Sequence, residues 1–254
     1  MNIKTFFSNY FYEHIYAFYH RRKRIRNFYK YKKIVINKYG LEIGGPSRVF
    51  KKKLPIYYHA KKIDGINFST STLWEKNLVD LGYFNYFMER SGTQYINDAT
   101  NLNKISDSTY DFLLSSHCLE HIANPLKALK EWGRVIKDNA FLVLVLPNKN
   151  GNFDRKRNFT QFEHILKDYE NNVDESDMTH LDEIITFHDF EMDKNSGTLD
   201  QFVKRGKNNL EIRGLHHHVF DESLIKNALD WCNFKVLDFD QDKTNFFTLA
   251  KKNS

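Results

Sequence analysis

The sequence predicts an α/β fold, in which helices cover both faces of a doubly wound, mostly parallel sheet of seven strands. From residue 34 onward, short apolar runs of strand length alternate with helical stretches. This alternation is typical of parallel sheets that are buried on both faces. The chain has 254 residues, of which 41% are hydrophobic and 28% are charged. It is therefore long enough for one large domain with a full core.

Seven runs have the length and apolar character of strands. The four clearest runs are Tyr39–Ile43, Lys61–Asp64, Asp111–Ser115 and Phe141–Leu146, and the three weaker ones are Thr93–Asn97, Lys235–Phe239 and Asn245–Lys251. With helical stretches between them, they predict a single domain over residues 37–254.

Two helices have clear start signals. Pro125–Ile136 follows Asn124, which is a favoured N-cap residue, and has proline at its first position, where the missing N–H costs nothing. Asp221 likewise precedes the helical stretch ESLIKNALDW, which leads into the last two strands.

Residues 148–218 interrupt the alternation with a polar stretch rich in His, Asp and Asn. An insertion of this length is more often functional than passive. We therefore expect a substrate-binding lid between the fifth strand of the pattern, Phe141–Leu146, and the last helix.

Residues 1–36 form a basic, aromatic extension that favours a helix. Residues 1–38 hold ten Lys or Arg and one acid, which leaves a net charge of −3 on the rest of the chain. The basic character therefore belongs to the head, and no nucleic-acid partner is expected for the body. Residues 1–33 are compatible with a helix packed on the domain or on a second subunit of a homodimer, or with a helix lying on an anionic membrane surface.

Two cysteines, Cys118 and Cys232, are far apart and form no C-x-x-C motif. This usage fits a reducing compartment and argues against a disulfide framework. No apolar run has the character of a signal peptide or a transmembrane span. The expected location is the cytoplasm, with the inner face of the membrane as an alternative.

A glycine turn and a later acid are spaced as in nucleotide-binding folds. The turn is Leu41-Glu42-Ile43-Gly44-Gly45-Pro46-Ser47, and Asp64 is expected to end the next strand. Small residues at such a turn let a ligand approach the backbone, and an acid about 20 residues further on is placed for ribose hydroxyls.

The run YDFLLSSHCLEHIANPLKALKEWGRVIKDNAFLVLVLP, residues 110–147, is the most specific feature of the sequence. Together with EIGGPS and the Asp98-Ala99 pair, it closely resembles the small-molecule branch of the class I S-adenosylmethionine-dependent methyltransferases. The resemblance covers residues 39–147 well, and the final helix and two strands loosely. It implies a Rossmann-like enzyme with S-adenosylmethionine as cofactor.

The resemblance also implies roles for individual residues. Asp64 would hold the ribose hydroxyls, and Asp98, beside Ala99, would accept a hydrogen bond from the adenine amine. The methionine end would meet Glu42, Gly44 and Gly45, and the opposite wall of the crevice would be Ser115, Ser116 and His117. All of these positions are expected at the carboxyl ends of strands, where such sheets bind ligands.

Two departures from the family pattern affect this region. Pro46 and Arg48 stand where small residues are common, and Asn139-Ala140 replaces a common Gly-Gly before the fifth strand. The first departure bears on the shape of the pocket around the methionine end.

Histidines are the candidate bases for an acceptor hydroxyl, because neutral imidazole accepts a proton near neutral pH. His121, His164 and His217 are the catalytic candidates, each with a structural role as the alternative. His218, Arg155 and Arg157 are candidates for binding the acceptor. No metal site is expected, because the histidines lack a convincing carboxylate or cysteine partner pattern.

The acceptor is less specified than the cofactor. The segments FDRKRNFTQFEHILKDY, THLDEI and LHHHVFD resemble the tails of methyltransferases of bacterial surface polysaccharides, such as capsule or O-antigen. The resemblance implies O-methylation of a polysaccharide precursor, a sugar nucleotide, or a phosphate- or phosphoramidate-type substituent. The alternatives are a lipid or quinone methyltransferase at the membrane and a non-catalytic scaffold. A nicotinamide dehydrogenase is disfavoured because the turn lacks G-x-G-x-x-G.

Overall fold

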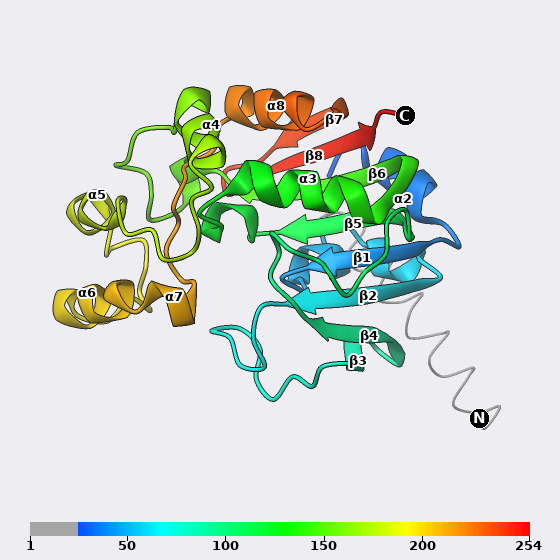
Figure 1. The fold of residues 1–254 in the computed structure, drawn as a ribbon, viewed down its shortest axis with the longest axis horizontal. Helices are drawn as coiled ribbons and strands as arrows, with labels where there is room; N and C mark the ends of the chain where they lie inside the picture. Colours follow the sequence, from blue (N-terminus) through cyan, green and yellow to red (C-terminus); the bar gives the residue numbers. More distant parts are fainter. Residues whose placement is uncertain (1–24) are drawn as a thin grey trace.

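A computed structural model describes residues 25–254 and shows a central sheet with helices on both faces and a cap of short helices at one end (Figure 1). The strands are β1 (Tyr39–Ile43), β2 (Lys62–Asn67), β3 (Gly82–Phe87), β4 (Arg90–Ile96), β5 (Tyr110–Ser116), β6 (Ile136–Pro147), β7 (Phe234–Gln241) and β8 (Asn245–Lys252). The α-helices are α2 (Phe28–Val35), α3 (Pro125–Val135), α4 (Phe162–Glu170), α5 (Leu181–Phe187), α6 (Leu199–Lys207), α7 (Asn209–Ile212) and α8 (Glu222–Trp231).

The sheet has the order β3-β4-β2-β1-β5-β6-β8-β7. Strands β4, β2, β1, β5 and β6 pair in parallel, and β8 pairs antiparallel with both β6 and β7. The strands are added on one side of β1 as far as β4 and on the other side from β5 onward. Doubly wound sheets bind ligands at such a change in the strand order. The predicted fold class is therefore confirmed, with one more strand than expected.

The additional strand is β3, which forms an antiparallel hairpin with β4 at the edge of the sheet. Its inner side chains Phe84 and Tyr86 are buried, whereas Tyr83 is 80% exposed. This alternation is the pattern of a strand with one solvated face.

Two apolar cores lie on the two faces of the sheet. One contains α3 and α8, with Trp132, Leu113 and Leu142 fully buried. The other contains α2 and the 3₁₀ turns Arg48–Lys51 and Ile56–Tyr58, which pack Tyr31, Phe50 and Tyr57 against the strands.

Both predicted helix caps are present. The Asn124 side chain accepts a hydrogen bond from the Lys127 amide at 3.1 Å, and Asp221 accepts one from the Leu224 amide at 2.7 Å. The helix after Asn124 ends at Val135 rather than at Ile136, because Ile136 begins β6.

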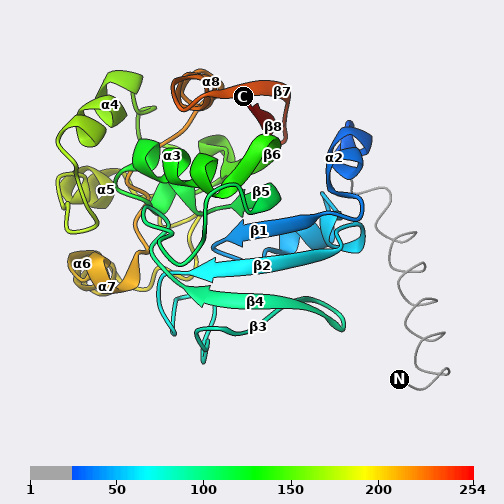
Figure 2. The ribbon, with the colours of Figure 1, turned by 45° about the vertical axis from the view of Figure 1, so that its right-hand side comes forward.

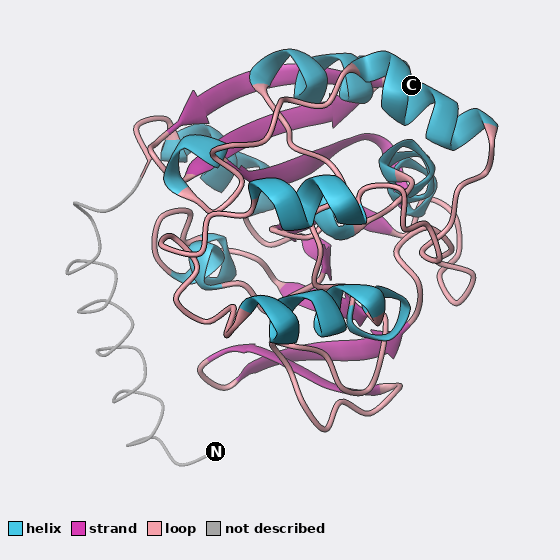
Figure 3. Ribbon diagram, turned by 90° about the vertical axis from the view of Figure 1, so that its left-hand side faces the viewer, coloured by secondary structure: helices cyan, strands magenta, loops and turns pink. Residues whose placement is uncertain are grey.

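The expected lid, residues 148–218, folds into α4 to α7 beyond the carboxyl ends of β1, β2 and β5 (Figure 1). Figure 3 views the molecule from this side, with helices in front of the strand ends. A small separate core of Leu181, Ile184, Phe202 and Leu215 holds α5 and α6 together. Residues 148–218, called the lid below, therefore lie over the edge at which the fold binds ligands, and their role in substrate binding stays a prediction.

Much of the predicted N-terminal extension, residues 1–24, lies outside the described residues. Helix α2 packs on the sheet at the end away from the lid (Figure 2), with Tyr31 and Val35 fully buried. No helix within residues 25–254 combines the length and the apolar character that a membrane span requires.

Candidate active site

The glycine turn follows β1 directly. Gly44 has a φ of 77°, a left-handed conformation that glycine adopts without strain, and its N–H donates to the Ile66 carbonyl at 2.9 Å. A β-carbon on Gly45 would lie 2.3 Å from the Glu42 carboxyl carbon. The second glycine is therefore required by the close approach of Glu42.

Glu42 is completely buried beneath this turn. Its carboxylate accepts hydrogen bonds from the Ser47 amide at 3.0 Å and from the Tyr57 hydroxyl at 2.5 Å. Burial raises the pKa of Glu42 to about 7, and the two hydrogen bonds oppose this rise. These contacts give Glu42 the position of a group that shapes the turn, and Glu42 is not among the residues lining a pocket.

A narrow crevice lies at the carboxyl ends of β1 and β2. Gly44 and Ala99, both predicted from the sequence, line it. His121, a catalytic candidate, also lines it. The remaining wall, which the sequence did not indicate, is formed by Ile43, Ile66, Asn67, Phe68, Trp74, Asn97, Cys118, Ile122 and Arg213. The open volume is about 30 Å³, which is room for about one water molecule.

Asp98 stands at this edge, as expected, but it has a partner from the lid. Its Oδ2 is 2.7 Å from Nη2 of Arg213, and Oδ1 accepts hydrogen bonds from the amide and hydroxyl of Thr100. Burial opposes ionisation of Asp98, but Thr100 and Arg213 outweigh it and lower its pKa. The Arg213 guanidinium also lies 4.6 Å from the centre of the Phe68 ring. Arg213 thus bridges the lid and the crevice.

Asp64 does not end its strand, so that part of the prediction is wrong. Strand β2 continues to Asn67, and Asp64 pairs in register with Leu41, in the middle of β1. Its carboxylate accepts hydrogen bonds from the Thr93 amide at 2.7 Å and from the Tyr110 hydroxyl at 2.9 Å. Tyr110 begins β5, so Asp64 faces away from the carboxyl edge. Asn67 and Phe68 occupy the edge position that was expected for it.

The three residues at the end of β5 lie at the correct edge. Ser115 is fully buried, and its hydroxyl has no hydrogen-bond partner, whereas Ser116 is 7% exposed. His117 has a φ of 51°, and its Nε2 lies 2.7 Å from the Asn245 side-chain oxygen. None of the three lines the crevice, so their cofactor contacts stay predictions.

A larger cavity of about 390 Å³ adjoins the crevice under the lid, a volume within the range of small-molecule sites. Its apolar wall includes Trp74, Phe153 and Phe202, and its polar groups are His121, Asp154, His188, Asp193, Asn195, Arg205, Asn209 and His216. Trp74 and His121 line both the crevice and this cavity.

The protonation of His121 follows from its contacts. Its Nδ1 is 3.0 Å from the Leu215 carbonyl, which only accepts hydrogen bonds, so Nδ1 carries the proton and Nε2 carries the lone pair. Burial, and then the neighbouring His216, lower the pKa of His121 well below 6.5. His121 is therefore neutral at pH 7, in the state that accepts a proton.

His216 is held by a buried ion-pair network. Its Nδ1 lies 2.5 Å from Oδ2 of Asp154, whose Oδ1 accepts from Nη1 of Arg157 at 3.0 Å. Burial opposes ionisation of Asp154, but His216 and Arg157 outweigh it and lower its pKa to about 2. Against the lowering effect of burial, Asp154 raises the pKa of His216. The pair is thus charged beside the cavity.

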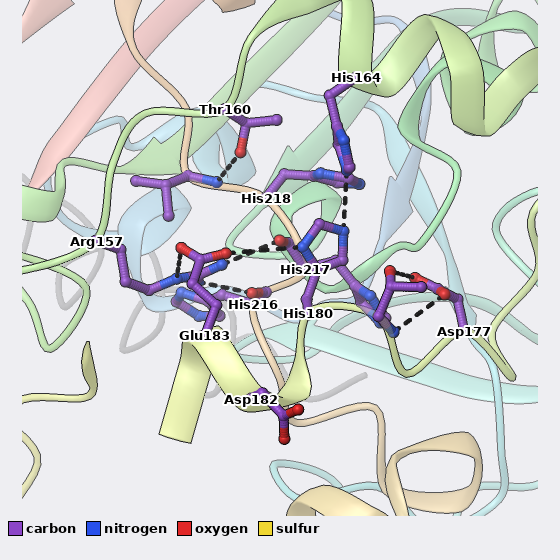
Figure 4. A network of polar contacts seen from close by, with 12 residues as sticks. Arg157, Thr160, His164, Asp177, His180, Asp182, Glu183, His216, His217 and His218 are labelled. Carbon is purple, nitrogen blue, oxygen red and sulfur yellow. Dashed lines mark hydrogen bonds and ion pairs between the residues drawn. The ribbon is translucent and has the colours of Figure 1, made fainter. Parts of the chain in front are cut away.

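The two predicted arginines do not reach the cavity. Arg157 is 2% exposed, and its guanidinium donates to Glu183 and to the carbonyls of the 216–217 backbone (Figure 4). It also donates to Asp154. It is a structural residue, so its assignment to acceptor binding is wrong. Arg155, whose side chain is 42% exposed, pairs with the buried Asp189, and Arg205 is the arginine that lines the cavity.

The other predicted histidines lie outside both pockets. His217 is buried, with Nε2 3.2 Å from the Asn209 amide, and His218 donates from Nε2 to the Ala123 carbonyl at 3.1 Å. His164 lies against His180, with 3.1 Å between their Nε2 atoms. Of the three candidate bases, only His121 lines a pocket.

The crevice suits an adenosyl group in its chemistry. It offers the bare backbone of Gly44, apolar walls at Ile66 and Ile122 and the amide side chain of Asn67. Asp98 does not line the crevice itself but pairs with Arg213, which does. Trp74 and Arg213, from loop and lid segments, are among the residues that line this small space. A nucleoside is larger than the open volume, so its binding there requires lining side chains to move.

Comparisons with known proteins identify the domain and the fold. Residues 43–144, from the end of β1 into β6, match the family model of a methyltransferase domain. A putative methyltransferase from Bacillus halodurans aligns with a TM-score of 0.53 at 11% identity, over 89% of this chain and 97% of that one. An S-adenosylmethionine-dependent methyltransferase from Mesorhizobium loti aligns with a TM-score of 0.50 at 11% identity, over 86% of this chain and 93% of that one.

At these identities the two alignments support the fold, and the match of residues 43–144 supports the activity. None of the curated proteins matches the sequence. Residues 43–144 thus form a methyltransferase domain on a Rossmann-like sheet, and the protein is a methyltransferase with S-adenosylmethionine as its cofactor.

Proposed function

We propose that the enzyme methylates a hydroxyl of a sugar-like acceptor bound in the 390 Å³ cavity under the lid. The acceptor classes are a polysaccharide precursor, a sugar nucleotide, and a sugar with a phosphate- or phosphoramidate-type substituent. The observation that carries the proposal is His121, which lines both the crevice and the cavity and has its Nε2 lone pair free.

The side chains that line the cavity suit a sugar ligand. Phe153, Phe202 and Trp74 offer aromatic faces for the apolar face of a sugar ring. Carboxylates, amides and imidazoles beside them can bind ring hydroxyls, in the usual pattern of an apolar pocket with a few polar groups. Arg205 adds a guanidinium that is suited to a phosphate-type substituent.

The chemistry demands little from the protein beyond alignment. The bound cofactor supplies an electrophilic methyl carbon on a sulfonium, and its leaving thioether is neutral. Trp74 and the crevice wall orient the acceptor, and His121 takes the hydroxyl proton at Nε2. Burial, and then the neighbouring His216, keep the His121 imidazole neutral by lowering its pKa.

The direct test is a methyl-transfer screen over sugar nucleotides, sugar phosphoramidates and quinones, read by the mass of the product. We expect a mass increase of one methyl group on a sugar-containing acceptor. Methylation confined to quinones would contradict the sugar assignment and favour the lipid alternative. Binding of S-adenosylmethionine without transfer to any compound of the panel would count against the sugar classes tested.

His121→Gln tests the base, with His59→Gln as the matched control outside both pockets. We expect kcat to fall about 100-fold, at the lower end for a general base, because alignment supplies most of the acceleration. The KM for S-adenosylmethionine should stay unchanged. An unaltered kcat in His121→Gln would remove the base and leave the methyltransferase assignment intact.

A further inference from the structure

Four metal-ligating side chains converge in the lid, away from both pockets. His164 and Asp168 lie four residues apart on α4, so they share one face of the helix. His180 comes directly before α5, and His218 lies in the segment that leads to α8. Figure 4 shows the three imidazoles together, with His164 pointing at His180.

The distances within this cluster match those of a tetrahedral metal site. Zinc bonds of 2.0–2.2 Å place neighbouring ligand atoms roughly 3.4 Å apart. Nε2 of His164 is 3.1 Å from Nε2 of His180 and 3.5 Å from Oδ2 of Asp168. The same Asp168 oxygen is 3.7 Å from Nε2 of His218, and all four ligand atoms lie within 4.8 Å of one another.

The negative charge of the Asp168 carboxylate has no lysine or arginine partner among the described residues. Oδ2 of Asp168 is buried and accepts no hydrogen bond. Its ion-pair contacts are with His164 and His218, and no lysine or arginine of residues 25–254 forms one with it. A buried carboxylate that faces imidazoles is the donor set that a divalent cation completes.

We propose that these four side chains bind one divalent transition-metal ion, for which zinc fits the distances and the nitrogen-rich donor set. Four protein ligands leave no open position, which is the arrangement of a structural site rather than a catalytic one. The cluster also lines neither pocket. The ion would link α4, the start of α5 and residues 216–218.

His218 is less ready to bind a metal ion than the other three ligands, because its Nε2 already has a hydrogen-bond partner outside the cluster. His218 at present donates from Nε2 to the Ala123 carbonyl at 3.1 Å. Metal binding at Nε2 moves its proton to Nδ1, which is buried and has no hydrogen-bond partner. We therefore expect His218 to contribute less affinity than the other three ligands.

A metal ion bound at this site would affect the acceptor cavity, because residues next to the site in sequence line that cavity. The neighbouring His216 lines the cavity, and the Leu215 carbonyl fixes the proton on His121. The small lid core of four buried residues gives this region few apolar contacts of its own. Metal binding would therefore stabilise the lid more than the sheet.

A second set of ligands, Asp177, His180 and His217, shares His180 and is the competing arrangement. Oδ1 and Oδ2 of Asp177 accept from the backbone and hydroxyl of Thr179, so this carboxylate already has partners (Figure 4). Asp177→Asn is consequently the matched control for Asp168→Asn.

The test is zinc binding to the full chain, measured by elemental analysis after dialysis and by competition with a zinc chelator. We expect one zinc per chain in the wild type, Asp177→Asn and His59→Gln. Asp168→Asn and His164→Gln should lose at least 10-fold in zinc affinity, and His180→Gln should lose binding. Absence of zinc binding by the wild type, or loss in Asp177→Asn with retention in Asp168→Asn, would overturn the proposal.

Cobalt and melting measurements keep the test independent of activity and of folding failures. The cobalt-loaded wild type should show the intense visible absorption of tetrahedral Co²⁺, which Asp168→Asn should weaken. A chelator should lower the Tm of the wild type by several degrees and leave that of His180→Gln unchanged. An octahedral cobalt spectrum, or equal Tm shifts in both proteins, would contradict a four-ligand protein site.

Discussion

The sheet, which β1 to β6 form within residues 39–147 together with β7 and β8, is held together by apolar side chains. The lid, residues 148–218, instead depends on charged and imidazole groups around a core of four residues. In the sheet, Leu113, Leu142 and Trp132 have no exposed surface. In the lid, a large fully buried side chain is Arg157, a guanidinium with protein partners on its nitrogens.

The difference shows how the two regions combine stability with function. Apolar burial is non-directional, and close packing of the buried side chains makes the sheet stiff. A buried polar network requires every partner to be in place, so it specifies one arrangement of the lid. The rigid strand ends thus position the cofactor crevice, and the lid sets the geometry of the acceptor cavity.

Leu113→Ala should give the largest loss of global stability. The side chain is fully buried in β5, and removing it leaves a cavity in the main core. We expect the free energy of unfolding to fall by about 4 kcal/mol, measured by denaturant titration. Leu181→Ala in the lid core should cost much less. Equal losses for the two variants would break the distinction between sheet and lid.

Arg157→Met should act locally, in the lid. It leaves the Asp154 carboxylate buried with His216 as its remaining charged partner. We expect a loss of about 3 kcal/mol, visible as faster amide hydrogen exchange over residues 215–220. Protection of the β5 and β6 amides should stay at the wild-type level, and a uniform loss of protection would contradict local action.

Glu42 gives the sheet region a pH dependence of its own. Its folded pKa of about 7 lies above the ordinary value of 4.5, so between these values the folded state binds more protons than the unfolded state. Stability from this group is therefore greatest at low pH and falls as the pH rises. From pH 5 to pH 7 we expect a loss of about 2 kcal/mol.

The measurement compares the free energy of unfolding of the wild type and Glu42→Gln over this pH range. The slope with pH should be smaller for Glu42→Gln, because its amide does not titrate. Parallel curves for the two proteins would show that Glu42 keeps an ordinary pKa.

Asn124 joins the two regions and should give the smallest effect. Its oxygen caps α3 at the Lys127 amide, and its amide group donates to the carbonyls of Asp168 and Val173 near α4. Asn124→Asp keeps the cap and loses the donated bonds, and we expect a cost of about 1 kcal/mol. Asn124→Ala should cost about 1 kcal/mol more, measured by thermal unfolding.

Much of the sheet could be predicted from the sequence because its signals are local. Apolar runs and capping residues placed seven strands and two helices within a few residues of their positions. Asn139, where the resemblance would have glycine, adopts a φ of 61°, which asparagine tolerates better than most residues. Strand β3 was missed because its inward and outward side chains alternate within a short hairpin.

The candidate site could be predicted only in part, because its contacts join distant segments. Gly44, Ala99 and Asp98 follow from motifs at strand ends, but Arg213 reaches Asp98 from 115 residues further along the chain. The Asp64 assignment failed because the strand was taken to end at that acid, although Gly65, Ile66 and Asn67 continue it. No local pattern indicates that Arg157 turns inward while the Arg155 side chain stays partly exposed.

Trp74 and His121 together form a common partition between the crevice and the cavity. A ligand that moves these two side chains on one side changes the space available on the other side. Binding in the crevice and binding in the cavity are thereby linked, and each ligand must change the affinity for the other by the same factor. The affinity for the methyl donor must then change with the acceptor by the same factor as the affinity for the acceptor changes with the donor.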